Sequence, residues 1–136
     1  IIGKSNIIAD YGNDIAIIGC GSMVYNALEA SELLNNQELK TTVIDMHTIK
    51  PIDEKMLEKI TKNFKLIVTV EEHNIIGGLG SAVAEFISGI RQSPPLLKIG
   101  VEDNYGEAGN YQTLLKDKKL MPDQIFKLVC DKFRTI

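Results

Sequence analysis

The chain has 136 residues, the size of one ordinary domain, and 44% of them are hydrophobic, which is enough to build a core. Its formal net charge of −3 argues against a nucleic-acid partner, because phosphate contacts need clustered Lys and Arg. No apolar run approaches the roughly 20 residues that span a bilayer, so we expect no membrane partner.

Short apolar runs predict the strands of a sheet. In chain order they are Ile15–Ile18 (followed by Gly19), Thr41–Met46, Leu66–Val70 and Leu96–Val101. Runs this short and apolar are typical of strands buried on both faces, as a parallel sheet requires. Asn6–Ala9, before a turn at Tyr11–Asp14, is the candidate for an additional edge strand.

Apolar residues at helical spacing lie between these runs. Ser22 and Asp53 are the expected N-caps of two helices, a third carries the stripe from Leu79 to Ile90, and Pro122 opens the last. Alternating strands and helices predict a three-layer α/β/α sandwich. Since no repeat or linker interrupts the pattern, we expect residues 1–136 to form a single domain.

The first Gly-rich turn, Gly19–Ser22, follows a strand and opens a helix. Such a turn can hold phosphate on its backbone N–H groups. The dinucleotide fingerprint, however, needs a small residue where this chain has Val24, and Asp45 is displaced from the ribose-binding position. We therefore interpret the segment as a tight strand-to-helix turn.

The second Gly-rich turn contains Gly77, Gly78 and Gly80. It has no Lys, which excludes a Walker loop, but its glycines permit close approach of an anion or of another protein surface. It follows the polar cluster Glu71–Asn74 at the expected carboxyl end of a strand. In an open α/β sheet, ligands and partners usually dock at that edge.

The cluster Glu71–Asn74 contains two acids and a histidine, which could perform acid–base chemistry. Adjacent side chains of a strand point to opposite faces, so Glu71 and Glu72 are not expected to form a close pair. We favour a solvated or interface-facing polar turn over catalysis. After the next strand, Asp103 and Tyr105 lie in a turn-rich segment, where Tyr105 is either an interface anchor or part of an ordinary loop.

Other reactive side chains are isolated in the sequence. His47 has no His or Cys residues around it at metal-ligand spacing. Cys20 and Cys130 do not form a metal-spaced pair either, and we expect two free, mostly buried thiols, as in a reducing cytoplasm.

Three segments together resemble one family: Asp45–Asp53, Val68–Glu85 and Asp103–Gly109. The family is transketolase, specifically its C-terminal domain or C-terminal subunit. Related domains occur in deoxyxylulose-5-phosphate synthase and in the beta subunits of 2-oxo-acid dehydrogenases. The resemblance covers nearly the whole chain in order, although Lys116–Leu120 replaces the family's usual glycine-containing turn.

The resemblance implies a mostly parallel five-stranded sheet with one antiparallel edge strand, Asn6–Ala9. It also implies that thiamine diphosphate and a divalent metal, Mg or Ca, bind between two other domains of the parent enzyme. This chain lacks the family's Gly-Asp-Gly metal motif. We therefore expect no catalytic, cofactor-binding or metal-binding residue on it.

The function implied is that of a structural and assembly domain of a cytoplasmic transketolase, which moves two-carbon ketol units between sugar phosphates. Its partners would be the coenzyme-binding domains or subunit of the same enzyme, in a homodimer, and the isolated chain would be inactive. The absence of Met at position 1 suggests that upstream sequence is missing. The candidate interface or ligand-edge residues are Glu72, His73, Gly77, Gly78, Gly80, Asp103 and Tyr105.

Two alternatives stay open. The chain could instead belong to a deoxyxylulose-5-phosphate synthase or to a dehydrogenase beta subunit, although the sequence around His47 and around Gly106 favours transketolase. It could also be an independent ligand-binding regulatory module that uses the two Gly-rich turns and His73.

Overall fold

The computed structural model describes residues 2–74, 78–101 and 120–136, with the side chains of 73, 74 and 101 left out. In these residues strands and helices alternate as the sequence predicts. The elements are β1 (Asn6–Asp10), β2 (Ile15–Gly19), α1 (Met23–Asn36), β3 (Thr41–Asp45), α2 (Glu54–Asn63), β4 (Leu66–Asn74), α3 (Leu79–Ser88), β5 (Leu96–Val101) and α5 (Pro122–Phe133).

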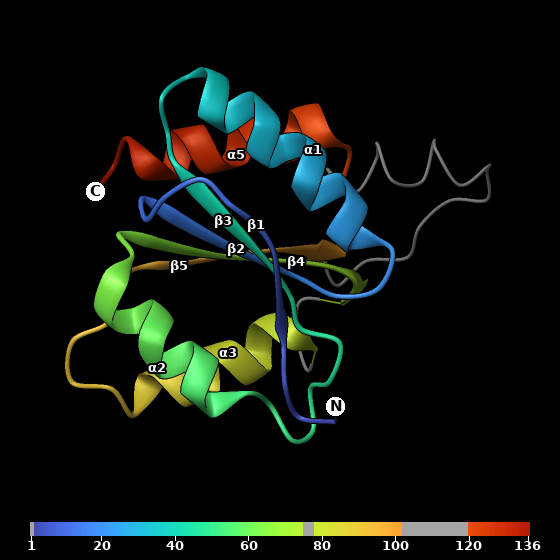
Figure 1. Ribbon diagram of the computed structural model, residues 1–136, viewed down its shortest axis with the longest axis vertical. Helices are drawn as coiled ribbons and strands as arrows, with labels where there is room; N and C mark the ends of the chain where they lie inside the picture. Colours follow the sequence, from blue (N-terminus) through green and yellow to red (C-terminus); the bar gives the residue numbers. More distant parts are fainter. Residues whose placement is uncertain (1, 75–77, 102–119) are drawn as a thin grey trace.

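The strands form one five-stranded sheet in the order β1-β3-β2-β4-β5. The pairs β3–β2, β2–β4 and β4–β5 are parallel, whereas β1 is antiparallel to β3. Helices α1 and α5 cover one face of the sheet, and α2 and α3 cover the other (Figure 1). The predicted three-layer sandwich with one antiparallel edge strand is therefore confirmed.

The central strand β2 divides its side chains between the two faces. All of its residues are buried, because it has a strand on each side and helices above and below. Ile15 and Ile17 belong to the core cluster under α1 and α5, whereas Ala16 and Ile18 belong to the cluster over α2 and α3. This alternation explains why a continuous apolar run marks a strand here.

The ends of several elements depart from the prediction. The Asp53 carboxylate accepts a hydrogen bond from the Met56 backbone N at 3.1 Å, so the predicted cap of α2 is confirmed. Ser22 occupies the N-cap position of α1, as predicted, but its side chain makes no capping hydrogen bond there. Strand β4 continues beyond Val70, where Asn74 pairs with Val101 of β5, and α3 ends before Ile90.

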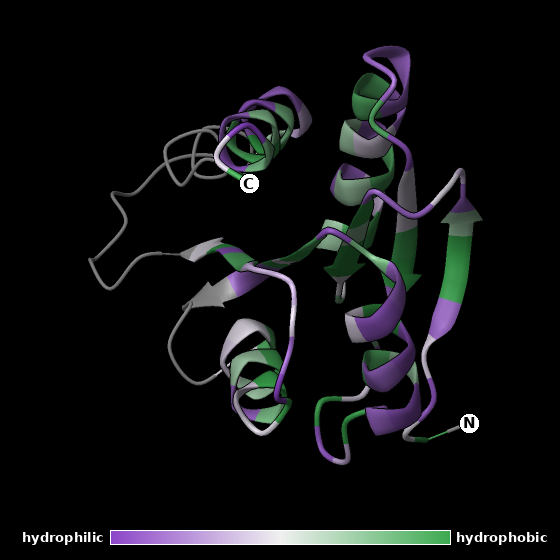
Figure 2. Cartoon of the chain, turned by 90° about the vertical axis from the view of Figure 1, so that its left-hand side faces the viewer, coloured by the Kyte–Doolittle hydropathy of each residue, from purple (hydrophilic) through white to green (hydrophobic). Residues whose placement is uncertain are grey.

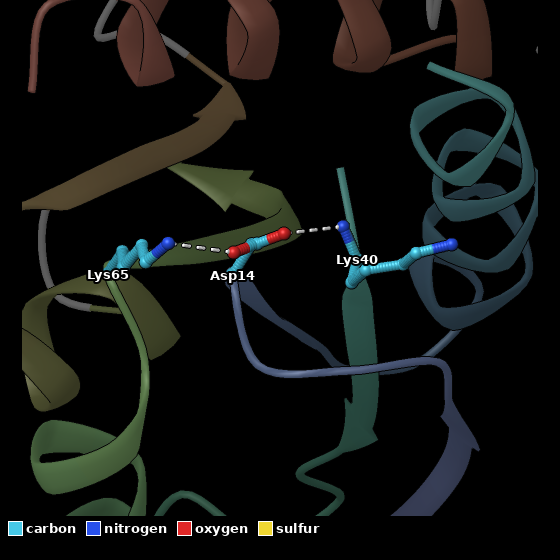
Figure 3. Close-up of polar contacts among 3 residues, drawn as sticks. All are labelled: Asp14, Lys40 and Lys65. Atoms are coloured by element: carbon cyan, nitrogen blue, oxygen red, sulfur yellow. Dashed lines mark hydrogen bonds and ion pairs between the residues drawn. The ribbon is translucent and has the colours of Figure 1, made fainter. Parts of the chain in front are cut away.

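Asp14 joins segments that precede three of the strands. It lies just before β2, and its Oδ2 accepts a hydrogen bond from the backbone N of Lys40 at 2.9 Å, just before β3. Its Oδ1 lies 3.2 Å from the Nζ of Lys65, just before β4 (Figure 3). The Lys40 bond and then the Lys65 contact outweigh burial and hold the pKa of the Asp14 carboxyl below its usual range. This carboxylate therefore fixes the amino ends of the central strands.

Replacing Asp14 by asparagine should lower the free energy of unfolding by about 1 kcal/mol at neutral pH, because the charge strengthens both contacts. The folded-state pKa is lowered, so this stability is present above the ordinary value of 3.8 and is lost as the pH falls through the folded-state pKa. Urea unfolding curves of Asp14→Asn and the unsubstituted chain should therefore converge in acid. The control is Asp131→Asn, which removes an exposed ion pair with Arg134 and should change little. A difference that persists unchanged in acid would contradict this assignment.

Candidate functional site

The connections of the sheet reverse direction between β2 and β4. The chain leaves β2 through α1 and enters β3 on one side, and it leaves β4 through α3 and enters β5 on the other. Helices α1 and α3 lie on opposite faces (Figure 1). In open α/β sheets, ligands bind in the crevice that such a reversal creates at the carboxyl ends of the strands. Here the reversal lies between Gly19–Ser22 and Glu71–Glu72.

A hydrogen bond joins the two sides of this reversal. The Ser22 hydroxyl donates to Oε2 of Glu72 at 2.7 Å and so ties the start of α1 to the end of β4. The turn before Ser22 depends on its glycines for backbone reasons. Gly21 has a φ of +61°, and a Cβ on Gly19 would lie 3.3 Å from the Cα of Val24. These contacts are those of a tight strand-to-helix turn.

Glu71 lies on the other side of β4 and is completely buried. Its Oε1 accepts a hydrogen bond from the backbone N of Leu79 at 2.8 Å, and its Oε2 accepts one from the backbone N of Gly80 at 2.6 Å. These N–H groups open α3, where a bound anion would be stabilised by the helix dipole. The anion at this helix terminus is therefore a side chain of the protein itself.

The expectation of a solvated or interface-facing turn is wrong for Glu71. Strand alternation sends Glu71 to the face covered by α3 and Glu72 towards Ser22 at the start of α1. The two acids are consequently separated, as expected. A buried carboxylate is stable here because both of its oxygens accept backbone hydrogen bonds.

The described residues of this edge do not fit the diphosphate group or the metal of thiamine diphosphate. The N–H groups of Leu79 and Gly80 are already bonded to Glu71, and Glu72 and Asp45 add negative charge nearby. An acidic edge repels a diphosphate. Within residues 2–74, 78–101 and 120–136, no group of three or more His, Cys, Asp or Glu side chains could hold a metal ion.

The pKa of the Cys20 thiol reflects burial in this acidic environment. Burial, followed by the charges of Glu71, Asp45 and Glu72, raises the pKa of its thiol to about 11. Cys20 is half-buried and Cys130 is buried, and both are free, in line with the expectation for the thiols.

Alkylation of Cys20 by iodoacetamide should therefore be slow at neutral pH, because the thiolate is the reacting form. In a Cys130→Ala variant, which leaves Cys20 as the only cysteine, the rate should rise roughly tenfold per pH unit towards a midpoint of about 11. Mass spectrometry measures the rate, and circular dichroism checks that the fold persists. A midpoint at the ordinary value of 9.0 would show that neither burial nor the acids act on this thiol.

The structure places some of the predicted site residues at this edge. Glu72 contacts Ser22, Gly78 immediately precedes α3, and Gly80 packs α3 tightly against the sheet. His73 is part of β4, but its side chain lies outside the described residues, as do Gly77, Asp103 and Tyr105.

Two further sequence features can be placed. His47 is exposed, and its Nδ1 lies 3.1 Å from the Oγ1 of Thr48. In the part of the chain that the structure describes, no helix has the length and apolar character needed to cross a membrane.

The fold and this edge define a class of protein: a doubly wound α/β domain in which the chain's own carboxylates accept the hydrogen bonds of Ser22 and of the start of α3. The family model for the C-terminal domain of transketolase matches residues 3–125. The chain therefore belongs to the transketolase C-terminal domain family, as the sequence motifs indicate.

Two similar proteins are both longer than the chain. A putative transketolase C-terminal section from Methanocaldococcus jannaschii is 42% identical over 133 residues, which are 98% of this chain and 41% of the relative. The 1-deoxy-D-xylulose-5-phosphate synthase of Cytophaga hutchinsonii is 38% identical over 128 residues, 94% of this chain and 20% of the synthase. The chain thus spans less than half of either relative.

Solved structures agree on the fold. A chain described as a split gene transketolase, in an inactive beta4 tetramer, matches with a TM-score of 0.89 and 36% identity, over 97% of this chain and 43% of that one. Transketolase from Campylobacter jejuni matches with a TM-score of 0.70 and 15% identity, over 95% of this chain and 18% of that one. The latter similarity concerns the fold alone.

Proposed function

We propose that this chain is the assembly domain of a thiamine-diphosphate enzyme of the transketolase type, in which other domains bind the coenzyme. The observation that carries the proposal is the pair of hydrogen bonds from α3 to the buried Glu71 carboxylate. They occupy the helix terminus at the switch point, where a phosphate would otherwise bind. The edge of the sheet at which the parallel strands end can then form a rigid surface of an interface.

The parent reaction is the transfer of a two-carbon ketol unit between sugar phosphates, in a cytoplasmic homodimer. When bound to the other domains, thiamine diphosphate with Mg or Ca supplies the electron sink for this chemistry. The role of this chain is positional: the Ser22–Glu72 bond and the Glu71 bonds hold the starts of α1 and α3 in place. The surface that we propose meets the coenzyme-binding domains includes Glu72, His73, Gly77, Gly78, Asp103 and Tyr105, and the buried Gly80 supports it by holding α3 against the sheet.

Reconstitution tests this proposal. The purified chain is mixed with the polypeptide that carries the coenzyme-binding domains, and ketol transfer between sugar phosphates is followed by mass spectrometry. We expect activity from the mixture and none from this chain alone, in keeping with the inactive assembly described for the split-gene relative. Turnover by this chain without the second polypeptide would refute the proposal.

A second candidate is the same structural role in a 1-deoxy-D-xylulose-5-phosphate synthase, which the similarity to the Cytophaga hutchinsonii enzyme favours. The reconstituted enzyme distinguishes the two. Formation of 1-deoxy-D-xylulose 5-phosphate, without ketol transfer between sugar phosphates, would assign the chain to the synthase.

A further inference from the structure

Large apolar side chains are exposed along the N-terminal segment and β1. Ile2 is 81% exposed, and Ile7 and Ile8 in the middle of β1 are 43% and 44% exposed. Figure 2 shows β1 at the edge of the sheet beside the N-terminus, with a hydrophobic middle between polar ends. We call Ile2, Ile7 and Ile8 the N-terminal edge surface. Large apolar side chains left exposed on and next to an edge strand are candidates for an interaction site.

A β-bulge shapes this surface. Ile7 pairs with Ile44 of β3 and Ala9 pairs with Val43, so Ile8 is the extra residue on β1. Ile7 consequently lines a cavity beside α2, whereas Ala9 packs against the core under α1. Bulges on edge strands discourage the addition of a further strand. The surface is therefore suited to a partner that packs side chains against it.

The segment before β1 is anchored to the body of the domain. Both the backbone N and the hydroxyl of Ser5 donate to Oδ2 of Asp53, at 2.8 and 2.9 Å, while Oδ1 caps α2 at Met56. Burial would raise the pKa of Asp53, but these hydrogen bonds lower it below the usual range. The segment that leads into β1 is therefore held at a fixed place on the domain.

That place lies at the carboxyl edge of the sheet. Because β1 is antiparallel, its first residue, Asn6, is opposite Asp45 at the end of β3. The anchored segment thus emerges at the same edge as the Ser22–Glu72 bond. One partner could contact both regions.

We infer that the N-terminal edge surface docks against the polypeptide that carries the coenzyme-binding domains. The inference rests on the proposed function and names a second part of its interface. The chain spans only 41% and 20% of the Methanocaldococcus and Cytophaga relatives, so most of such a protein lies outside it. The anchored segment lies at the same edge as the Ser22–Glu72 bond, where a partner could contact both. A cavity of about 210 Å³, lined in part by Ile7, Met56, Ile60 and Phe64, can receive an apolar side chain of the partner.

Binding between this chain and the coenzyme-binding polypeptide, measured by calorimetry, tests the inference. Ile8→Lys should weaken the complex at least tenfold, because it places a charge in an apolar interface. The matched control is Leu33→Lys on α1, which alters another exposed aliphatic residue (38% exposed) and should change the affinity less than twofold. Urea unfolding of both variants verifies that they fold.

Hydrogen exchange gives an independent readout without substitution. The amides of residues 6–10 should exchange at least tenfold more slowly in the complex, and those on the exposed face of α1 should not change. If Ile8→Lys leaves the affinity unaltered and the exchange at residues 6–10 does not change, the N-terminal edge surface is not a docking site. The proposed function would be unaffected by that result. Failure of the unsubstituted chain to bind would overturn both. Self-association of the chain that Ile8→Lys abolishes would identify a second copy as the occupant and refute the inferred partner.

Discussion

Glu71→Ala should lower the free energy of unfolding by about 3 kcal/mol, because it leaves two buried backbone N–H groups without an acceptor and removes a charge from the start of a helix. The carboxylate is fully buried and bonds to the backbone N atoms of Leu79 and Gly80. The replacement also leaves a cavity at this position. Urea unfolding followed by circular dichroism measures the loss.

Two variants separate the charge from the general effect of substitution. Glu71→Gln keeps the shape but has one acceptor oxygen for two N–H groups, so it should lose about 2 kcal/mol. Glu85→Gln changes an exposed acid on the same helix and should alter stability by no more than about 0.5 kcal/mol. If Glu71→Ala proved as mild as Glu85→Gln, the capping role of Glu71 would be excluded.

Gly80→Ala should lower the free energy of unfolding by about 1 kcal/mol. A Cβ at this position would lie 2.9 Å from the Oγ1 of Thr69 and 3.0 Å from the Cγ and Cδ of Lys98. Thr69 is fully buried and β-branched, so it cannot easily turn away. Overpacking of this kind costs about 1–3 kcal/mol and outweighs the roughly 1 kcal/mol that alanine gains over glycine inside a helix.

Two comparisons test the steric origin of this effect. Gly89 at the other end of α3 has open space, since its nearest contact would be the Phe86 carbonyl at 3.6 Å, so Gly89→Ala should be nearly neutral. In a Thr69→Ala background, Gly80→Ala should cost at least about 1 kcal/mol less than in the unsubstituted chain. Equal costs in both backgrounds would mean that Thr69 does not limit the approach of α3.

The fold follows from local patterns that the sequence displays directly. The apolar run Ile15–Ile18 predicts a strand buried on both faces, and β2 is the strand with neighbours on both sides. Asp53 predicts the start of α2 because its capping partner is three residues away. Features that depend on near neighbours in the chain are therefore predictable.

Features that depend on residues far apart in the chain cannot be predicted from such local patterns. Ser22 has the right residue type for a cap, but its hydroxyl bonds to Glu72, 50 residues further along the chain. Alternation predicts that Glu71 and Glu72 point apart, yet it does not say which of them meets α3. Strand β4 extends past its apolar run because Asn74 pairs with β5, and polar residues give no apolar pattern to reveal this.

One signal could have identified the role of Glu71. An apolar strand run followed directly by an acid, and then by a Gly-rich helix start without a lysine, places a carboxylate near unpaired backbone N–H groups. In this chain the helix begins eight residues after that acid, at Leu79. The same arrangement in another α/β domain would argue against a phosphate site at that helix.

Calorimetric titration of thiamine diphosphate with Mg²⁺ into the purified chain tests the assignment of coenzyme binding to other domains. A parallel titration into the polypeptide that carries those domains serves as the positive control. We predict saturable heat in the control and none with this chain, because Glu71 occupies the N–H groups of α3. Saturable binding of thiamine diphosphate to this chain alone would contradict the account.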